Sequence, residues 1–264
     1  MIEIVAAAGL ATVQDGGRPG HMHEGVPPGG ALVPELLARA NAAARNAPGE
    51  AAIEAFGAIT IVARGPILVA SDDGDARVLR DGDTVPLAGS RARVRYVAVR
   101  GGIDVPRVLG GRGTLLVARL GGHEGRPLRR GDVLRVGAAP PDDRTIPPPI
   151  DADAPVQVVL GPDLDRFPAT TIDAFLASTF TVDARSDRVG ARLAGPRLES
   201  LADPASPSAP MVRGAIQVPP SGELIVLGPD HPTTGGYAVI ATVVRRHLGP
   251  LAARPIGAAV RFVT

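Results

Sequence analysis

A polar loop between residues 230 and 237 carries side chains whose types could do chemistry. It follows an apolar run, a Pro-Pro-Ser-Gly turn and a second apolar run within residues 214–240. The loop contains an acid, an imidazole, hydroxyls, glycines and a phenol, at Asp230, His231, Thr233, Thr234, Gly235, Gly236 and Tyr237. Paired glycines can turn backbone N–H groups toward a bound anion. By spacing alone, the segment fits a long hairpin loop equally well, since such loops also need Gly and Pro.

A second chemically dense loop lies near the start of the chain, at residues 12–30. Its many Gly and Pro residues exclude regular structure, and long loops inside a domain are often functional. Gln14, Asp15 and Arg18 supply amide, carboxylate and guanidinium groups. His21 and His23 have metal-ligand spacing, but no second ligand cluster accompanies them, so we do not predict a metal site.

Asp187 and Arg188, beside Gly190, form a third candidate. An arginine presents a planar fork that suits carboxylate or phosphate, so this pair could clamp a substrate. Most charged turn residues are structural or solvated, which favours an ion pair between Asp187 and Arg188 that stabilises the turn.

Composition excludes several function classes. The 264-residue chain has a net charge of +1 and only 3% aromatic residues, which disfavours a dedicated nucleic-acid binder. It has no cysteine, which rules out disulfides, zinc–thiolate sites and a thiol nucleophile. All 28 basic residues are arginine, so the chain has no lysine for a Schiff base or for attaching biotin.

Nothing in the sequence predicts a membrane or secreted protein. Residues 1–17 lack the charged and apolar regions of a signal peptide. No run of about 18 apolar residues exists. We therefore expect a soluble, cytoplasmic protein.

The elements that must position these loops are mostly short strands. A helix is expected at residues 34–46, with Leu36, Leu37, Ala40 and Ala44 on one face. A second helix is expected at 171–177, capped by Thr170 or Thr171, and residues 237–248 favour a strand followed by a turn. Strands are expected at 51–54, 59–63, 67–70, 76–79, 84–87, 93–99, 156–160, 180–182 and 260–263. Many short strands with Gly/Asp turns are typical of a barrel or sandwich.

A Pro- and Asp-rich segment at residues 140–155 marks a boundary. We predict one subdomain at 1–139, a linker at 140–155, and a second β subdomain at 156–264.

Four motifs in fixed order resemble a known family over nearly the whole chain. They are TVQDGGRPGHMHEGVPPGGA (residues 12–31), AVRGGIDVPRVLGGRGT (98–114), SDRVGARL (186–193) and GAIQVPPSGELIVLGPDHPTTGGY (214–237). The sequence is similar to the biotin-dependent carboxyltransferase family, also called allophanate hydrolase subunit 2. The resemblance implies a mainly β fold with a few helices, a cyclophilin-like β-barrel in two subdomains. It also implies a companion subunit that completes the active site.

The sequence departs from the family pattern at two places. Family members usually carry Ser-Gly-Ala-Met-Asp where this chain has Gly29-Gly30-Ala31-Leu32-Val33, which removes a hydroxyl and a carboxylate. The closing barrel turn usually has Gly-Asp, whereas this chain has Gly257-Ala258.

The resemblance implies one component of an ATP-dependent 5-oxoprolinase, a hydrolase that opens the lactam of 5-oxoproline to glutamate. ATP with Mg²⁺ would be shared with partners: a companion of the allophanate hydrolase subunit 1 type or the 5-oxoprolinase B type, and an A-type companion. One alternative is a carboxyltransferase that uses carboxybiotin on a separate carrier. Another is a regulatory protein that antagonises its companion.

The resemblance also suggests roles for particular residues. The catalytic candidates are Asp187, Arg188, Asp230 and Tyr237. The binding candidates are Gln14, Asp15, Arg18, Gln217, Thr233, Thr234, Gly235 and Gly236. In either chemistry, a nest of backbone donors at residues 234–236 would hold an oxyanion or phosphate, with Arg188 or Arg18 balancing its charge. Asp187, Asp230 or Asp15 would serve as general base or Mg²⁺ ligand.

Overall fold

The chain folds into two compact units. The computed structural model describes residues 1–89, 91–139, 145–201 and 207–264. Unit 1 comprises residues 1–19 and 29–150, and unit 2 comprises residues 20–28 and 151–264. Part of the predicted linker, residues 140–144, lies outside the described residues. The 20–28 segment leaves unit 1 after its second strand and belongs to unit 2.

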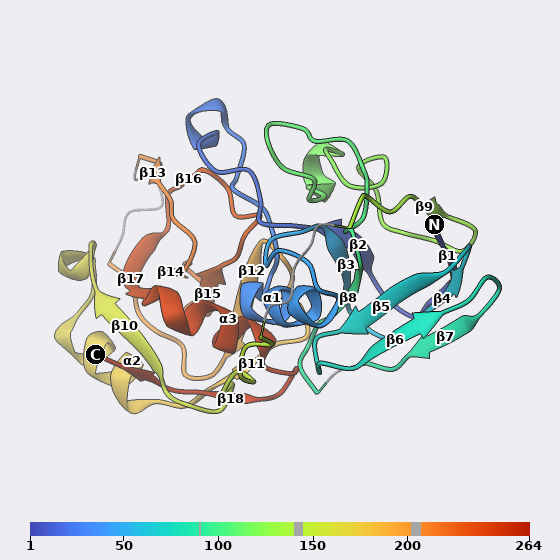
Figure 1. Cartoon of the computed structure of the whole chain (residues 1–264). Helices are drawn as coiled ribbons and strands as arrows, with labels where there is room; N and C mark the ends of the chain where they lie inside the picture. Colours follow the sequence, from blue (N-terminus) through green and yellow to red (C-terminus); the bar gives the residue numbers. More distant parts are fainter. Residues whose placement is uncertain (90, 140–144, 202–206) are drawn as a thin grey trace. The chain divides into compact units, whose positions relative to one another are not determined.

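Unit 1 contains two antiparallel sheets (Figure 1). The first has the order β7 (Thr84–Leu87), β4 (Ile59–Ala63), β1 (Ile2–Ala7) and β9 (Val133–Leu134). The second has the order β2 (Ala11–Gln14), β3 (Ala52–Ala55), β8 (Arg95–Val99), β5 (Ile67–Ser71) and β6 (Ala76–Leu79). Ile4 and Ile61 from one sheet share a core with Ile53 and Val97 from the other. The alternating apolar residues of β1 and β4 therefore face this core.

Helix α1 (Pro34–Ala43) contacts β8 and β5 of unit 1. It begins with Pro34 in the first turn, where a missing N–H is tolerated. The prediction that it reaches Asn46 was wrong, because Arg45 adopts a left-handed conformation with φ 60° and ends the helix. Asn46 is buried instead, and its Nδ2 donates to the Val99 carbonyl at 2.7 Å.

Unit 2 is a nearly closed barrel. Its sheet has the order β18 (Ala259–Val260), β11 (Phe180–Val182), β12 (Gly190–Ala194), β15 (Leu224–Leu227), β14 (Ala215–Val218), β17 (Ala238–Val243), β10 (Val156–Leu160) and β19 (Phe262–Val263). The two outermost strands are consecutive parts of one segment, interrupted only at Arg261. Residues 259–263 therefore pair with β11 on one side and with β10 on the other, which brings the sheet around on itself.

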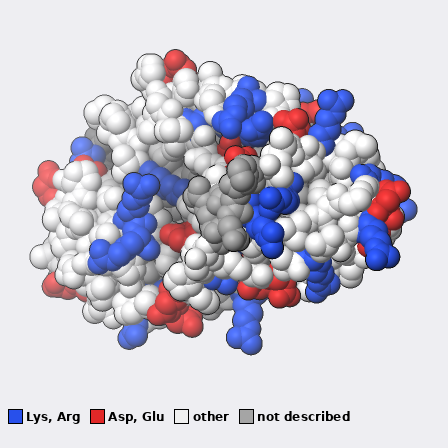
Figure 2. All heavy atoms as spheres, in the orientation of Figure 1, with Lys and Arg blue, Asp and Glu red and all other residues white. Residues whose placement is uncertain are grey.

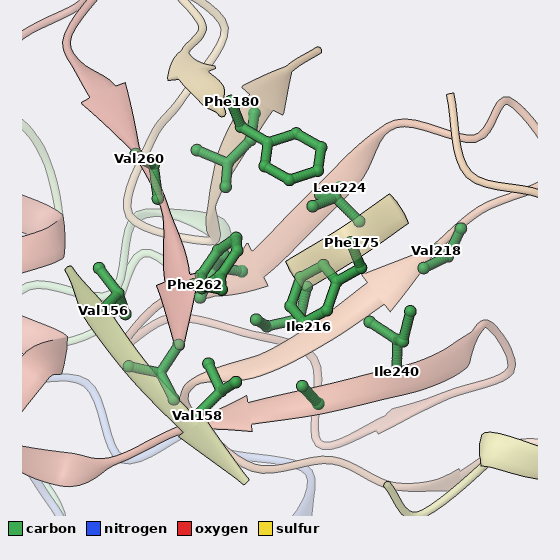
Figure 3. Packing of buried hydrophobic residues seen from close by; sticks show 14 of the residues in the cluster. Val156, Val158, Phe175, Phe180, Ile216, Val218, Leu224, Ile240, Val260 and Phe262 are labelled. Carbon is green, nitrogen blue, oxygen red and sulfur yellow. The ribbon is translucent and has the colours of Figure 1, made fainter. Parts of the chain in front are cut away.

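An aromatic cluster fills the core of unit 2 (Figure 3). Phe175 and Phe262 stack with ring centroids 4.8 Å apart, and Phe180 lies 6.0 Å from Phe262. Phe175 comes from helix α2 (Ala169–Ala177), whose end was predicted correctly but which begins two residues earlier than predicted. The predicted cap at Thr170 or Thr171 was wrong, since the N-cap residue is Pro168 and it makes no side-chain cap hydrogen bond.

Helix α3 (Arg245–Ala253) corrects the prediction for residues 237–248. The strand was expected there, and β17 confirms it, but a helix follows where a turn was expected. The β-branched residues before it and Pro250 within it disfavour helix locally. Leu251 and Ala253 are buried, so tertiary packing outweighs that local preference.

The described residues also form three short 3₁₀ turns and one two-stranded ribbon. The turns are η1 (Met22–Glu24), η2 (Leu116–Ala118) and η3 (Leu164–Arg166), and the ribbon pairs β13 (Ala209–Pro210) with β16 (Thr234–Gly235). The predicted mainly β fold with a barrel and a few helices is confirmed.

On the face drawn in Figure 2, basic and acidic side chains are interspersed. Among the described residues, none of the helices has the length and apolar character needed to cross a bilayer.

Candidate functional site

Part of the predicted loop at residues 230–237 is held in extended form within unit 2. Thr234 and Gly235 pair with Pro210 and Ala209 as the β13–β16 ribbon. The Met211 N–H donates to the Thr233 carbonyl at 2.9 Å and extends this pairing by one residue. Thr233 and Gly235 are half-buried, whereas Thr234 and Gly236 are exposed. Backbone pairing, not a free turn, therefore sets the shape of the loop.

The predicted anion nest at residues 234–236 is not formed. Neither Gly235 nor Gly236 has a positive φ, so the backbone lacks the alternating hand that makes neighbouring N–H groups converge. Gly235 is required for another reason, because a Cβ there would lie 2.9 Å from Gln217 Nε2 and 3.3 Å from Met211 Cγ. The missing side chain lets the Gln217 amide approach the loop backbone.

Gln217 is a buried amide on β14 with a weak partner. Its Nε2 donates to the Met211 thioether sulfur at 3.3 Å, and the residue is 6% exposed. Sulfur of this kind is a poor acceptor. A carbonyl oxygen arriving beside Gly235 would therefore be a better partner for this N–H group.

Arg188 and Asp230 form a buried, bidentate ion pair. Arg188 Nε donates to Asp230 Oδ2 at 2.8 Å, and Arg188 Nη2 donates to Asp230 Oδ1 at 2.9 Å. Both side chains are less than 10% exposed. This pair ties the start of the 230–237 loop to the turn before β12, so Arg188 is engaged by a carboxylate of its own chain.

Asp187 does not pair with Arg188, and that prediction was wrong. Asp187 Oδ1 instead accepts the backbone N–H groups of Val189 at 2.8 Å and Gly190 at 3.0 Å. The residue is exposed and forms a local turn cap. A short acidic side chain three residues before a glycine favours this arrangement over an ion pair with its neighbour.

His231 is a buried imidazole that the sequence did not single out as a site residue. It is 0% exposed, and its Nδ1 lies 2.7 Å from the Pro232 carbonyl oxygen. Because a carbonyl only accepts, Nδ1 carries the proton and Nε2 presents a lone pair. Nε2 is buried and has no hydrogen-bond partner among the described residues. Its position directly after Asp230 was visible in the sequence, but burial was not.

Burial is also the main reason that the pKa of His231 lies below its ordinary value. The hydrogen bond to Pro232 and the charge of Asp230 act in the opposite direction, and the charge of Arg213 adds to the lowering. The imidazole is therefore neutral at physiological pH, and Nε2 can accept an N–H donor.

Tyr237 ends the loop on the surface. Its side chain is large and apolar apart from the hydroxyl, and the residue is 49% exposed.

Gln14, Asp15 and Arg18 form a separate, buried group in unit 1. Asp15 accepts backbone N–H groups from Gly17 at 2.9 Å, Arg112 at 2.5 Å and Gly113 at 3.0 Å. The three side chains are at most 6% exposed. Asp15 therefore holds the loop around residue 112 against the loop that follows β2.

Arg18 also connects the loop that follows β2 to the loop around residue 112. Its Nη2 donates to the Gly113 carbonyl and its Nε donates to the Val108 carbonyl at 3.4 Å. Gln14 Nε2 donates to Thr12 Oγ1 at 3.1 Å and to the Thr114 carbonyl at 3.0 Å. The sequence predicted these side chains as binding groups, and the structure shows them organising backbone.

Residues 29–33, where this chain departs from the family pattern, lie next to the loop that follows β2, since the Ala31 N–H donates to the Asp15 carbonyl at 3.0 Å. Leu32 and Val33 are buried, and their N–H groups donate to Glu54 Oε2 at 2.8 Å and to the Tyr96 hydroxyl at 2.9 Å. The Tyr96 hydroxyl donates to Glu54 Oε2 at 2.5 Å. Here the segment is held by its backbone, so the lost hydroxyl and carboxylate are not needed to shape it.

The side chains that were considered as ligands for phosphate or a metal ion do not suit that role in this chain. Arg188 is matched by Asp230, and Arg18 donates to backbone carbonyls. His21 and His23 both contact the carboxylate of Glu24. His21 Nδ1 lies 2.9 Å from Glu24 Oε2, and His23 Nε2 lies 3.6 Å from Glu24 Oε1. In the described ranges, no three His, Asp or Glu residues gather as a metal-binding group. We assign no phosphoryl or metal step to these side chains.

An open cleft of about 580 Å³ lies within unit 1, lined by residues from 104–108, 119–125 and 133–135. None of the predicted site residues lines it. The glycines at 121, 122 and 125 on its wall match no known nucleotide-binding fingerprint.

Comparison with known proteins places this fold and sequence in a family. A family model described as "Carboxyltransferase domain, subdomain A and B" matches residues 88–264. The chain is 33% identical to the C subunit of 5-oxoprolinase from Escherichia coli, across 100% of this chain and 91% of that protein. It is 31% identical to the C subunit of 5-oxoprolinase from Haemophilus influenzae, across 99% and 90%.

A solved structure supports the fold. The urea amidolyase of K. lactis superposes with a TM-score of 0.88 at 24% identity, covering 99% of this chain. The chain spans only 18% of that much longer protein. From the family match and the full-length identity, the chain belongs to the carboxyltransferase domain family, subdomains A and B.

Proposed function

We propose that this chain is the C subunit of an ATP-dependent 5-oxoprolinase, which opens the lactam of 5-oxoproline to glutamate together with companion subunits. The observation that carries this proposal is the end-to-end match to a protein named as the C subunit of 5-oxoprolinase. The K. lactis urea amidolyase contains the same fold as one small part of a long chain.

The loop in unit 2 offers groups that suit a cyclic amide. A lactam has one N–H donor and one carbonyl acceptor. His231 Nε2 is a neutral acceptor without a partner in the described part of the chain, and Gln217 Nε2 is a donor whose recorded partner is a thioether. Buried polar groups without good partners are costly, so they favour a ligand that supplies the missing bond.

Our proposal assigns amide recognition to this chain and leaves ATP to its companions. ATP would supply activation of the lactam oxygen, after which water opens the C–N bond. The guanidiniums first considered for phosphate are already engaged within this chain. Asp230 is likewise held by Arg188, so its role is to position the loop that carries His231. Tyr237 would cover one face of the ring.

A second candidate is carboxyl transfer from carboxybiotin on a separate carrier. It is favoured by the description of the family and by the fold shared with urea amidolyase. The ureido ring of biotin is also a cyclic amide, with N–H and carbonyl groups like those of a lactam. The same loop could therefore serve either ring.

Reconstitution distinguishes the two candidates. The purified chain is combined with A-type and B-type companions, ATP and 5-oxoproline, and glutamate is measured after omission of each component. The proposal predicts glutamate only when every component is present, and no effect of avidin. Glutamate formation without this chain would overturn it. Loss of activity on avidin treatment would contradict the 5-oxoprolinase proposal and favour carboxyl transfer from carboxybiotin.

A further inference from the structure

The cleft in unit 1 is lined by two cationic side chains that have no ion-pair partner among the described residues. Arg119 and Arg135 line it and are exposed. Across the described parts of the chain, neither guanidinium makes a hydrogen bond or an ion pair. Two free guanidiniums on the walls of one cleft attract an anion, since each offers a planar set of donors to carboxylate or phosphate.

The acidic side chains at the cleft are already engaged. Asp104 Oδ1 lies 3.3 Å from Arg112 Nη2, and Glu124 Oε2 lies 3.1 Å from Arg126 Nε. Asp132, which does not line the cleft, accepts two hydrogen bonds from Arg126, at 2.7 and 2.9 Å. Arg112 and Arg126 thus engage these three carboxylates, which leaves the guanidiniums of Arg119 and Arg135 available and a net charge of +1 over the seven groups.

The backbone at residues 119–125 adds free donors. φ is positive at Gly121, Gly122, Glu124 and Gly125, but not at His123 between them. Such alternation turns successive N–H groups toward a common point, as in anion-binding nests. The N–H groups of His123 and Glu124 donate to no acceptor in the described structure. Glu124 and Arg119 adopt this conformation without being glycine, which costs free energy and is more frequent at functional sites.

This loop is rigidly supported. A Cβ on Gly122 would lie 1.9 Å from Thr114 Oγ1, and one on Gly121 would lie 2.3 Å from the Gly113 carbonyl oxygen. The glycines therefore pack directly on the segment that Asp15 and Arg18 hold in place. Donors on a preformed loop lose little entropy when a ligand binds.

His123 is fixed on the same wall. Its Nε2 lies 3.4 Å from Asp132 Oδ1, and its side chain is 20% exposed. Asp132 is itself anchored by Arg126 and by the Arg129 N–H at 2.9 Å. The imidazole is thus oriented by a carboxylate, and it adds a further polar group to the two arginines.

We propose that the cleft walled by Arg119, His123 and Arg135 is an oxyanion-binding site that takes the carboxylate or phosphate group of a small molecule. The free N–H groups of His123 and Glu124 would bind the oxyanion directly, and the two arginines would neutralise it. A cavity of about 580 Å³ accommodates a small organic anion. The site goes beyond the proposed function, since it shares no residue with the loop assigned to the cyclic amide.

Calorimetric titration of the whole chain tests the proposal. The probes are inorganic phosphate, glutarate as a dicarboxylate, and glutaramide as an uncharged analogue of similar size. We expect saturable binding of phosphate, glutarate or both, no binding of glutaramide, and weaker binding at high salt. Amide NMR signals of His123 and Glu124 should shift during titration with the anion that binds. Phosphate alone would identify a phosphate site, and glutarate alone a carboxylate site.

A charge-matched pair of variants locates the binding. Arg119→Ala/Arg135→Ala removes the two free guanidiniums, and we expect a loss in affinity of about tenfold or more. Arg129→Ala/Arg130→Ala removes two exposed arginines that do not line the cleft, and should change affinity much less. Thermal melts of both variants check that folding is retained. Equal losses in the two variants would show a general charge effect and overturn the proposal, as would the absence of anion binding at millimolar concentrations.

Discussion

Arg188 and Asp230 lie 42 residues apart in sequence yet meet through two parallel hydrogen bonds of 2.8 and 2.9 Å inside unit 2. This pair connects the SDRVG segment to the loop that carries His231. Two of the motifs that indicated the family are thereby joined by one interaction.

Removing one member of this pair should be strongly destabilising. Asp230→Ala leaves a buried guanidinium without its carboxylate, so we expect a loss of about 3–5 kcal/mol in the free energy of unfolding. Urea unfolding followed by circular dichroism measures it. Replacing both residues by apolar ones, Arg188→Met/Asp230→Leu, should cost less than either single change. Arg185→Ala, in an exposed pair with Asp183, is the control. Equal effects for Asp230→Ala and Arg185→Ala would contradict the interpretation.

Asp15 should stabilise the 112–113 segment through backbone hydrogen bonds. Asp15→Ala removes the acceptor for the N–H groups of Gly17, Arg112 and Gly113, and we expect a loss of about 2–3 kcal/mol. Hydrogen exchange should accelerate at Arg112 and Gly113 before global unfolding. Asp75→Ala changes an exposed acid and should alter stability by no more than about 0.5 kcal/mol. Unchanged protection at residues 112 and 113 would refute this role.

Asp132 should make stability depend on acid pH. Burial alone would raise its pKa, but hydrogen bonds from Arg126 and from the Arg129 N–H, with the nearby His123 and Arg126 charges, hold the pKa at about 2. Because the ordinary value is 3.8, the unfolded state binds the proton first as pH falls. This contribution is complete above about pH 4 and is lost toward pH 2.

The acid dependence can be measured as melting temperature between pH 5 and pH 2, for the wild type and Asp132→Asn. We expect a shallower decline for the variant. Asp165→Asn, at an exposed position, should leave the wild-type slope unchanged. Parallel curves for wild type and Asp132→Asn would show that another group dominates.

His231 should add a further loss of stability on acidification, at a pH closer to neutral than the loss due to Asp132. Burial lowers its pKa below the ordinary 6.5, so the unfolded chain takes up a proton that the folded chain resists. Stability should therefore fall as pH decreases through about 6.5 and below. His231→Gln should flatten this part of the curve. Burial also lowers the pKa of His247, with Arg246 and Arg254 adding to the effect, so His247→Gln measures its share separately.

Gly235 should matter for activity more than for stability. In Gly235→Ala, the new Cβ would meet Gln217 Nε2 at 2.9 Å and push the flexible amide aside. We expect a loss of about tenfold or more in kcat/KM of the reconstituted enzyme, since displaced donors no longer meet the reacting carbonyl. The melting temperature should change little. Gly16→Ala, which meets no atom within 4 Å, is the matched control. Full activity in Gly235→Ala would remove Gln217 from the proposed site.

Local patterns in the sequence were enough to place most strands. The runs at 76–79, 84–87 and 156–160 are bounded by turn residues, and the observed strands have the same limits. Helix α3 was missed because Val243, Val244 and Pro250 disfavour helix locally, whereas its packing depends on residues far along the chain.

The candidate site was harder to predict because its interactions are non-local. Sequence proximity favoured Asp187 as the partner of Arg188, but the partner is Asp230. Gly235 and Gly236 suggested a nest, whereas Gly235 pairs with β13 and neither glycine has a positive φ. Burial decides the role of His231, and a single histidine in a loop gives no sign of it.

The closure of the unit 2 barrel by residues 259–263 also constrains the order of events during synthesis. Unpaired strand edges invite association with other chains. Until this segment has been made, β11 and β10 each keep an edge that nothing else in the sheet covers. Unit 1 depends on no strand beyond residue 134 and can assemble earlier. The interval of greatest aggregation risk on the ribosome should therefore fall while unit 2 is nearly complete but not yet closed.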